Sequence, residues 1–125
     1  MRTTDYKTAK KLGLVSAVGI SVTVPSWFKG PVYERLVPPA DLVKRYKAGR
    51  VTSAAYFAEY RVQLDVLDAE SVYWDIYDLA GTGRAPTLCC WCAPGDFCHR
   101  YLIASWFRNH GLNCHELNTE VKGNE

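Results

Sequence analysis

The alternation of short apolar runs with longer amphipathic segments is the feature that most constrains the fold of this chain. Strands are expected over residues 14–24, 86–92 and 112–117, and the first two of these are predominantly apolar. Apolar side chains at three- and four-residue spacing predict helices over residues 39–47, 52–68, 69–79 and 97–110. Strands that alternate with helices are typical of a parallel sheet with crossover helices. The expected fold class is therefore a small, single α/β domain with a short, mostly parallel sheet flanked by helices, in a Rossmann-like three-layer arrangement.

A length of 125 residues suits one domain. We expect residues 1–12 to be a flexible N-terminal segment, residues 13–118 to form the domain and residues 119–125 to be a polar tail. The basic and then apolar start of the chain resembles a signal peptide. It has no small-residue cleavage site and continues into Pro25 and Trp27, which favours a buried strand. No apolar run reaches the length of a membrane-spanning helix, so we expect no membrane partner.

Charge and cysteine content narrow the classes of function. The formal net charge is +2, which argues against a protein that binds duplex DNA by charge alone. Five cysteines are present, and four of them fall between positions 89 and 98, which is poor spacing for disulfides. We expect free thiols and a cytoplasmic, reducing compartment.

A strand, a turn and a helix are expected to meet around the cysteines. Residues 93–95 are Ala-Pro-Gly, a turn sequence, and Asp96 is a good N-cap for the helix that follows. This cap would place Cys98 and His99 in the first helical turn and Arg100 just after it. A helix N-terminus and a guanidinium together favour a bound phosphate or carboxylate.

The same environment predicts reactive groups. A helix N-terminus lowers the pKa of a nearby thiol and makes it more nucleophilic. Cys90 and Cys98 are therefore the candidate nucleophiles or acid–base groups, His99 the proton carrier and Arg100 the anion clamp.

A second loop is expected to face the same ligand. Residues 25–39 hold four prolines and several aromatic side chains, and they follow the first predicted strand. Ligands of open parallel sheets bind at the carboxyl ends of the strands, so this loop and the cysteine loop are expected to share one pocket. The ligand would be small, anionic and nucleotide-like, with an aromatic side chain stacked on its base. The predicted ligand-binding residues are Pro25, Trp27, Phe28, Tyr33, Asp96 and Arg100.

Other interpretations remain open at this stage. The cysteines can be ordinary buried strand residues, and Arg100 can be a solvated helix residue or a partner of Asp96. No cofactor is predicted, but Cys90, Cys92, Cys98 and His99 are soft ligands that suit zinc or iron. Their spacing contains no pair of zinc knuckles. A redox pair of Cys90 and Cys98 is a variant of that interpretation.

A non-catalytic binding module is the third possibility. Its partner would be a nucleic acid or a protein, contacted by basic side chains at positions 44, 45, 47, 50 and 61. These side chains can equally form a solvated helix face. The spacing of Arg100 from the cysteines fits no phosphatase-type loop, and the chain has neither a Walker-type nor a dinucleotide-binding glycine motif.

Two separated blocks resemble a known family. Residues 25–38 match P-x-W-F-x-G…Y…L-x-P, and residues 88–106 match L-L-C-x-E-x-P-G-x-F-C-H-R-x-L-x-A-x-W. Both blocks, their spacing and the intervening Lys47-Ala-Gly49 and Tyr56…Tyr60 elements are similar to the domain-of-unknown-function 488 family. The resemblance spans about residues 14–117.

The resemblance places Cys90, Cys98, His99 and Arg100 on the recurrent positions of that family. One departure from the family pattern matters, because Cys92 stands where many members carry Glu. Any role of that acid as a base or ligand is lost here or passes to a thiol. The family's members are bacterial, archaeal and phage proteins of unknown function, which implies the cytoplasm of a prokaryotic or phage-infected cell.

Overall fold

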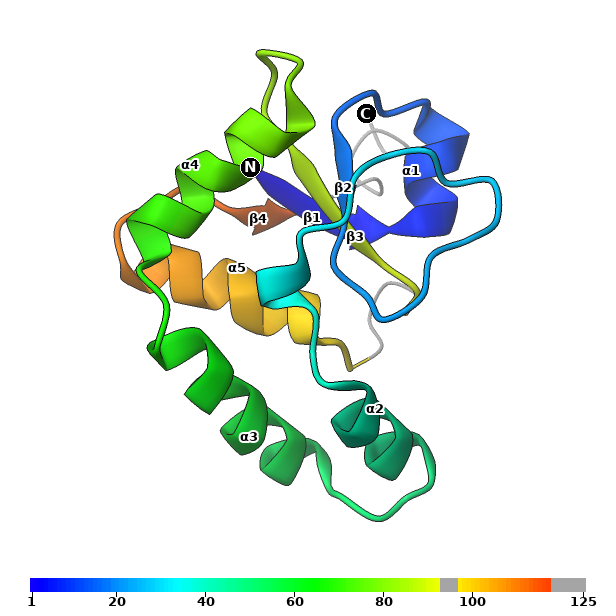
Figure 1. The fold of residues 1–125 in the computed structure, drawn as a ribbon, viewed down its shortest axis with the longest axis vertical. Coiled ribbons are helices and arrows are strands. Elements are labelled where there is room, and N and C mark those ends of the chain that lie inside the picture. The colour runs from blue at the N-terminus through cyan, green and yellow to red at the C-terminus, as the bar shows by residue number, and fades with distance from the viewer. Residues whose placement is uncertain (93–96, 118–125) are drawn as a thin grey trace, which may run out of the picture.

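A four-stranded parallel sheet organises the computed structural model, which describes residues 1–92 and 97–117 (Figure 1). The strand order is β2-β3-β1-β4, and every paired neighbour is parallel. The strands are β1 (Arg2–Asp5), β2 (Ala17–Gly19), β3 (Thr87–Cys90) and β4 (His115–Glu116). The α-helices are α1 (Tyr6–Leu12), α2 (Ala40–Lys47), α3 (Ser53–Asp65), α4 (Ala69–Ala80) and α5 (His99–Asn109). This arrangement confirms the predicted three-layer α/β fold class.

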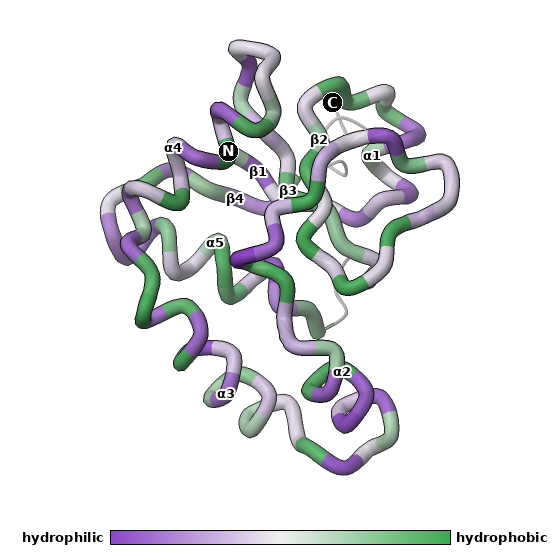
Figure 2. The backbone as a smooth tube through the Cα atoms, viewed as in Figure 1, coloured by the Kyte–Doolittle hydropathy of each residue, from purple (hydrophilic) through white to green (hydrophobic). Residues whose placement is uncertain are grey.

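The two faces of the sheet hold two hydrophobic cores. Successive side chains of a strand point to opposite faces, so Leu88 and Cys90 of β3 enter the larger core and Cys89 enters the smaller one. Helices α4 and α5 close the larger core, and α1 closes the smaller one. Helix α3 packs on the outside of α5. Figure 2 shows hydrophilic and hydrophobic residues alternating along α3, as expected for a helix with one packed face.

The N-terminal twelve residues are the main correction to the sequence-based prediction. Residues 1–12 were expected to be a flexible segment outside the domain, yet they form β1 and α1, and β1 lies between β3 and β4. Thr3 and Thr4 are buried, and the Asp5 carboxylate caps α1 by accepting a 3.0 Å hydrogen bond from the Thr8 amide. A four-residue strand of polar side chains has no hydrophobic periodicity, so only its backbone pairing identifies it.

The other elements differ from the predictions mainly at their ends. The strand predicted over residues 14–24 is confined to Ala17–Gly19, and the strand predicted over residues 112–117 is confined to His115–Glu116. Helix α5 begins at His99, two residues later than expected. The predicted N-cap Asp96 and the predicted tail over residues 119–125 lie outside the described residues.

Among the described residues, no helix combines the length and apolarity that a bilayer-spanning segment requires.

Candidate functional site

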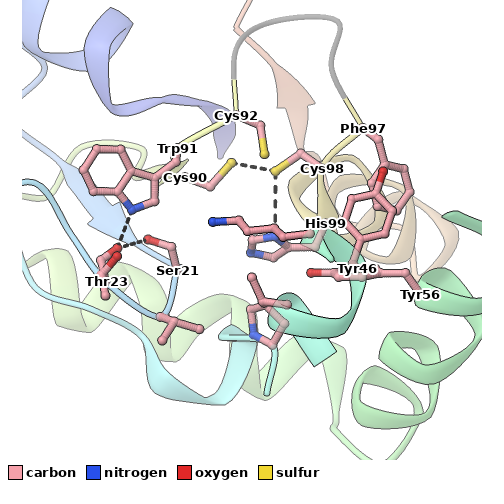
Figure 3. A pocket seen from close by; sticks show the side chains of 14 residues that line it. Ser21, Thr23, Tyr46, Tyr56, Cys90, Trp91, Cys92, Phe97, Cys98 and His99 are labelled. Carbon is pink, nitrogen blue, oxygen red and sulfur yellow. Dashed lines mark hydrogen bonds between the residues drawn. The ribbon is translucent and has the colours of Figure 1, made fainter. Parts of the chain in front are cut away.

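A pocket of about 140 Å³ opens at the carboxyl ends of β2 and β3 (Figure 3). We call it the cysteine pocket. Cys90, Cys92, Cys98 and His99 line one part of it. The remaining lining residues are Ser21, Val22, Thr23, Pro38, Val43, Tyr46, Lys47, Tyr56, Trp91 and Phe97. A ligand at this position lies where parallel α/β sheets usually bind one.

Three aromatic side chains form one wall of the cysteine pocket. The ring of Phe97 lies 4.9 Å from that of Tyr46 and 5.2 Å from that of Tyr56, measured between centroids. Tyr46 comes from α2 and Tyr56 from α3, so the helices outside the sheet contribute directly to the site. Such packed rings give a fixed apolar surface against which a planar ligand can lie.

The three thiols of Cys90, Cys92 and Cys98 form a cluster. Cys90 is the last residue of β3, and Cys98 precedes the first residue of α5. Their Sγ atoms lie 2.6 Å apart, and all three sulfur atoms lie within 4.8 Å of one another. All three cysteines are free, and only Cys92 is less than fully buried. The fold therefore brings together Cys90 and Cys98, which are the two predicted nucleophiles, and Cys92, which was predicted only as a metal ligand.

His99 is held in one tautomer beside this cluster. Its Nε2 lies 2.7 Å from the carbonyl oxygen of Ile20, so Nε2 carries the proton and donates it to that carbonyl. Its Nδ1 lies 3.7 Å from Cys98 Sγ and is left as an acceptor. Burial lowers the pKa of His99 to about 4, so the ring is neutral at pH 7. A neutral imidazole next to a thiol can take up the thiol proton.

Arg100 is a fully buried cation behind the cluster. Its Nε and Nη2 each donate a 3.0 Å hydrogen bond to the carboxylate of Glu116 on β4. Its Nη1 donates to Cys90 Sγ at 2.9 Å and to the Cys92 carbonyl oxygen at 2.8 Å. Arg100 is 0% exposed and does not line the cysteine pocket. Its charge therefore acts on the thiols, and its guanidinium does not face a ligand as an anion clamp would.

The three thiols of the cluster affect one another's ionisation. Hydrogen bonds from Cys90 and Cys98 lower the pKa of the Cys92 thiol far below its ordinary value, helped by the nearby His99 and Arg100. The hydrogen bond with Cys92 raises the pKa of Cys90, and the hydrogen bond with Cys90 raises that of Cys98. The cluster thus ionises as a unit that loses one proton readily and retains the others.

The predicted ligand-binding residues divide between different places. Trp27 and Phe28 line a second hollow, next to α1. Tyr33 is buried and its hydroxyl donates a 3.3 Å hydrogen bond to Asp75. Pro25 is buried as well, and Asp96 lies outside the described residues. The loop after β2 does reach the cysteine pocket, through residues 21–23 and Pro38, and only Pro38 belongs to the predicted range 25–39.

Several residues of the site were not among the sequence-based candidates. Tyr46 and Tyr56 were not singled out as ligand contacts, and Lys47 was named only as a basic side chain of the binding module or of a solvated helix face. Glu116 gave the clearest available signal, because it is the only acidic residue in the three predicted strands. A buried arginine requires such a partner.

The chain matches a model of a known protein family. The model DUF488-N3a, described as the active DUF488-N3 subclade, matches residues 1–111. The chain belongs to the DUF488 family. No curated protein and no solved structure matches the chain. The DUF488 match begins before β1 and includes all residues that line the cysteine pocket, so the family assignment covers the site.

The Arg100–Glu116 pair is expected to hold the site of this DUF488 protein together. Replacing Glu116 by Gln leaves the buried guanidinium without its carboxylate and should lower the free energy of unfolding by about 2 kcal/mol. Glu59→Gln is the matched control, because it breaks the exposed pair of Glu59 with Arg45 and should leave stability nearly unchanged. Urea unfolding measures both, and equal losses would contradict the central role of Arg100.

The ionisation of the cluster can be followed by alkylation. At pH 7 iodoacetamide should modify Cys92 first, because its thiolate persists well below the ordinary thiol pKa of about 8.5. Its rate should stay nearly constant from pH 8 to pH 6, whereas an ordinary thiol slows about tenfold per unit. Cys89 and Cys114 are internal controls, since burial raises their pKa values to about 12 and about 11. Peptide mass spectrometry showing equal labelling of all five cysteines would disprove this.

Proposed function

We propose that this DUF488 protein is an enzyme that applies a cysteine thiolate to a small, anionic, nucleotide-like ligand bound in the cysteine pocket. The observation that carries the proposal is the convergence of three thiols, a neutral imidazole and a buried guanidinium beside one aromatic-walled pocket. Groups with perturbed ionisation that gather in a cleft are typical of catalytic sites. The matching subclade is described as active, which agrees with catalysis.

The residues around the cluster have distinct roles in this proposal. Cys92 is the least buried of the three thiols and is the nucleophile. Its sulfur attacks an electrophilic carbon of the ligand, and the bond from that carbon to the leaving group breaks with its electron pair. The Cys98 thiol supplies a proton to the leaving group. Water then attacks the same carbon, the C–S bond breaks to regenerate the Cys92 thiolate, and the proton that water releases returns to Cys98 by way of His99 Nδ1. Arg100 is a positioning residue that stabilises negative charge on the cluster from behind.

The size and lining of the pocket favour a ligand with a single ring in its interior. A volume of about 140 Å³ is close to that of a cavity that holds a benzene ring, roughly 150 Å³. The aromatic wall provides a stacking surface for the ring. Lys47 lines the same pocket and is exposed, so it takes the role of anion contact that was expected of Arg100. Five free cysteines also fit a reducing compartment such as the cytoplasm.

A thermal-shift panel tests the ligand part of this proposal. The four nucleoside monophosphates and inorganic phosphate should be compared on the full chain, and at least one nucleotide should raise the melting temperature. Lys47→Ala should reduce that rise, because the anionic group loses its cation, while Lys44→Ala on the same helix should not. Cys92→Ser should keep the rise but lose any turnover detected by chromatography of the incubated nucleotide. If no nucleotide shifts the wild-type protein, the proposed ligand class is wrong.

A soft metal ion is the second candidate for this site. Cys90, Cys92 and Cys98 are three thiols within ligand distance of a common point. Zinc–sulfur bonds of about 2.3 Å place the sulfurs of a tetrahedral site roughly 3.8 Å apart. The 2.6 Å separation of Cys90 and Cys98 would therefore have to widen by roughly an ångström. Arg100 would offset the excess negative charge of three thiolates. His99, the fourth predicted ligand, is not part of this group.

Elemental analysis separates the metal site from the thiol enzyme. A metal site predicts one zinc or iron ion per chain in protein purified without chelator. That metal should be lost in Cys92→Ser and retained in Cys114→Ser, because Cys114 lies in another part of the larger core. Chelation should then lower the melting temperature of wild type alone. Metal content far below one equivalent in the wild-type protein would eliminate this candidate.

A further inference from the structure

Positive charge is concentrated in residues 6–33, and only residues 21–23 of this segment line the cysteine pocket. From Tyr6 to Tyr33 the chain has four lysines, Lys7, Lys10, Lys11 and Lys29, and no acidic residue. The whole chain has 15 basic and 13 acidic side chains, so the remainder is net negative with 11 and 13. All four lysines are exposed, and none forms an ion pair within the described residues. The sequence therefore places its excess positive charge on one region around α1.

A groove lies within this basic region. It has a volume of about 340 Å³ and runs between the C-terminal end of α1 and the loop over residues 27–30. Lys10, Trp27, Phe28 and Lys29 line it, and we call it the lysine groove. Lys10 Nζ lies 4.8 Å from the ring centroid of Trp27, which is 37% exposed. The Lys10–Trp27 contact is a favourable cation–π pair, and it places a partly exposed aromatic ring next to positive charge in the groove.

A row of aromatic rings connects the lysine groove with the cysteine pocket. The ring centroids of Trp27 and Phe28 are 6.4 Å apart, those of Phe28 and Tyr6 are 5.1 Å apart, and those of Tyr6 and Trp91 are 5.4 Å apart. Trp91 is 53% exposed and lines the cysteine pocket. Its Nε1 donates a 2.7 Å hydrogen bond to the carbonyl oxygen of Thr23, which fixes the ring in place (Figure 3). The two hollows are thus the two ends of one packed aromatic layer.

We propose that the lysine groove binds single-stranded nucleic acid. A base stacks on the exposed ring of Trp27, and Lys10 and Lys29 contact the phosphates on either side of it. Lys7 and Lys11 extend the positive surface along α1. An unpaired strand is the partner that fits, because only its base faces are free to stack, whereas duplex DNA presents mainly its phosphates. This binding goes beyond the proposed function and does not depend on catalysis.

Fluorescence anisotropy with a labelled oligothymidylate of about 20 nucleotides tests this on the full chain at low salt. Trp27→Ala should weaken binding about tenfold through lost stacking. The double variant Lys10→Glu, Lys29→Glu should weaken it further, and its salt dependence should fall by about 1.4 in the slope of log K against log salt. Trp74→Ala and Lys44→Glu are the matched controls, since both side chains are exposed on other helices. Neither control should change the affinity.

Several outcomes would overturn this inference. The inference fails if the oligonucleotide does not bind at low salt, or if both groove variants bind it as well as wild type does. It also fails if a duplex of the same length binds with equal affinity. Preferred binding to vesicles of phosphatidylserine and phosphatidylcholine would assign the basic surface to a membrane instead. Cys92→Ser should bind the oligonucleotide as wild type does, so a failure of the lysine groove and a failure of the thiol enzyme are distinguishable. Circular dichroism of each variant checks that the fold is retained.

Discussion

The buried guanidinium of Arg100 is the interaction on which the rest of the site depends. A fully buried cation is costly unless it is paired and its hydrogen-bond donors are satisfied. Here the carboxylate of Glu116 on β4, the sulfur of Cys90 on β3 and the carbonyl oxygen of Cys92 satisfy it. Arg100 itself belongs to the first turn of α5. One side chain therefore fixes two strands, one loop and one helix relative to one another.

This arrangement also determines the charge of the thiol cluster. A guanidinium donates hydrogen bonds and cannot accept them, so the sulfur it contacts is favoured as an acceptor. Cys90 takes that position, and its sulfur also lies 2.6 Å from that of Cys98. His99 closes the other side, because the Ile20 carbonyl holds its proton on Nε2 and leaves Nδ1 facing Cys98. Cys92 is the sulfur of the cluster that lies closest to solvent.

The sequence predicted the fold class and the chemistry-bearing cluster, because both depend on local patterns. The order of apolar runs and amphipathic helices was sufficient for the α/β class, and Cys90, Cys98, His99 and Arg100 do come together. The role of Arg100 in α5 could not be predicted, since it depends on Glu116, which is 16 positions away on strand β4. The strand β1 was missed because its polar threonines are buried through backbone pairing. The division of the predicted ligand-binding residues between two hollows could not be predicted either, because it depends on the directions of the side chains within the irregular loop over residues 25–39.

Cys92 links the family resemblance with the physical chemistry of the site. The motif that residues 88–106 resemble has Glu at this position, and a glutamate would bring a permanent negative charge to a cluster that already contains a buried cation. A thiol ordinarily brings no such charge at neutral pH. In this chain the neighbouring thiols and Arg100 lower the pKa of Cys92, so the cluster can hold one negative charge close to Arg100. The substitution therefore preserves the electrostatic balance while exchanging a weakly nucleophilic carboxylate for a strongly nucleophilic sulfur.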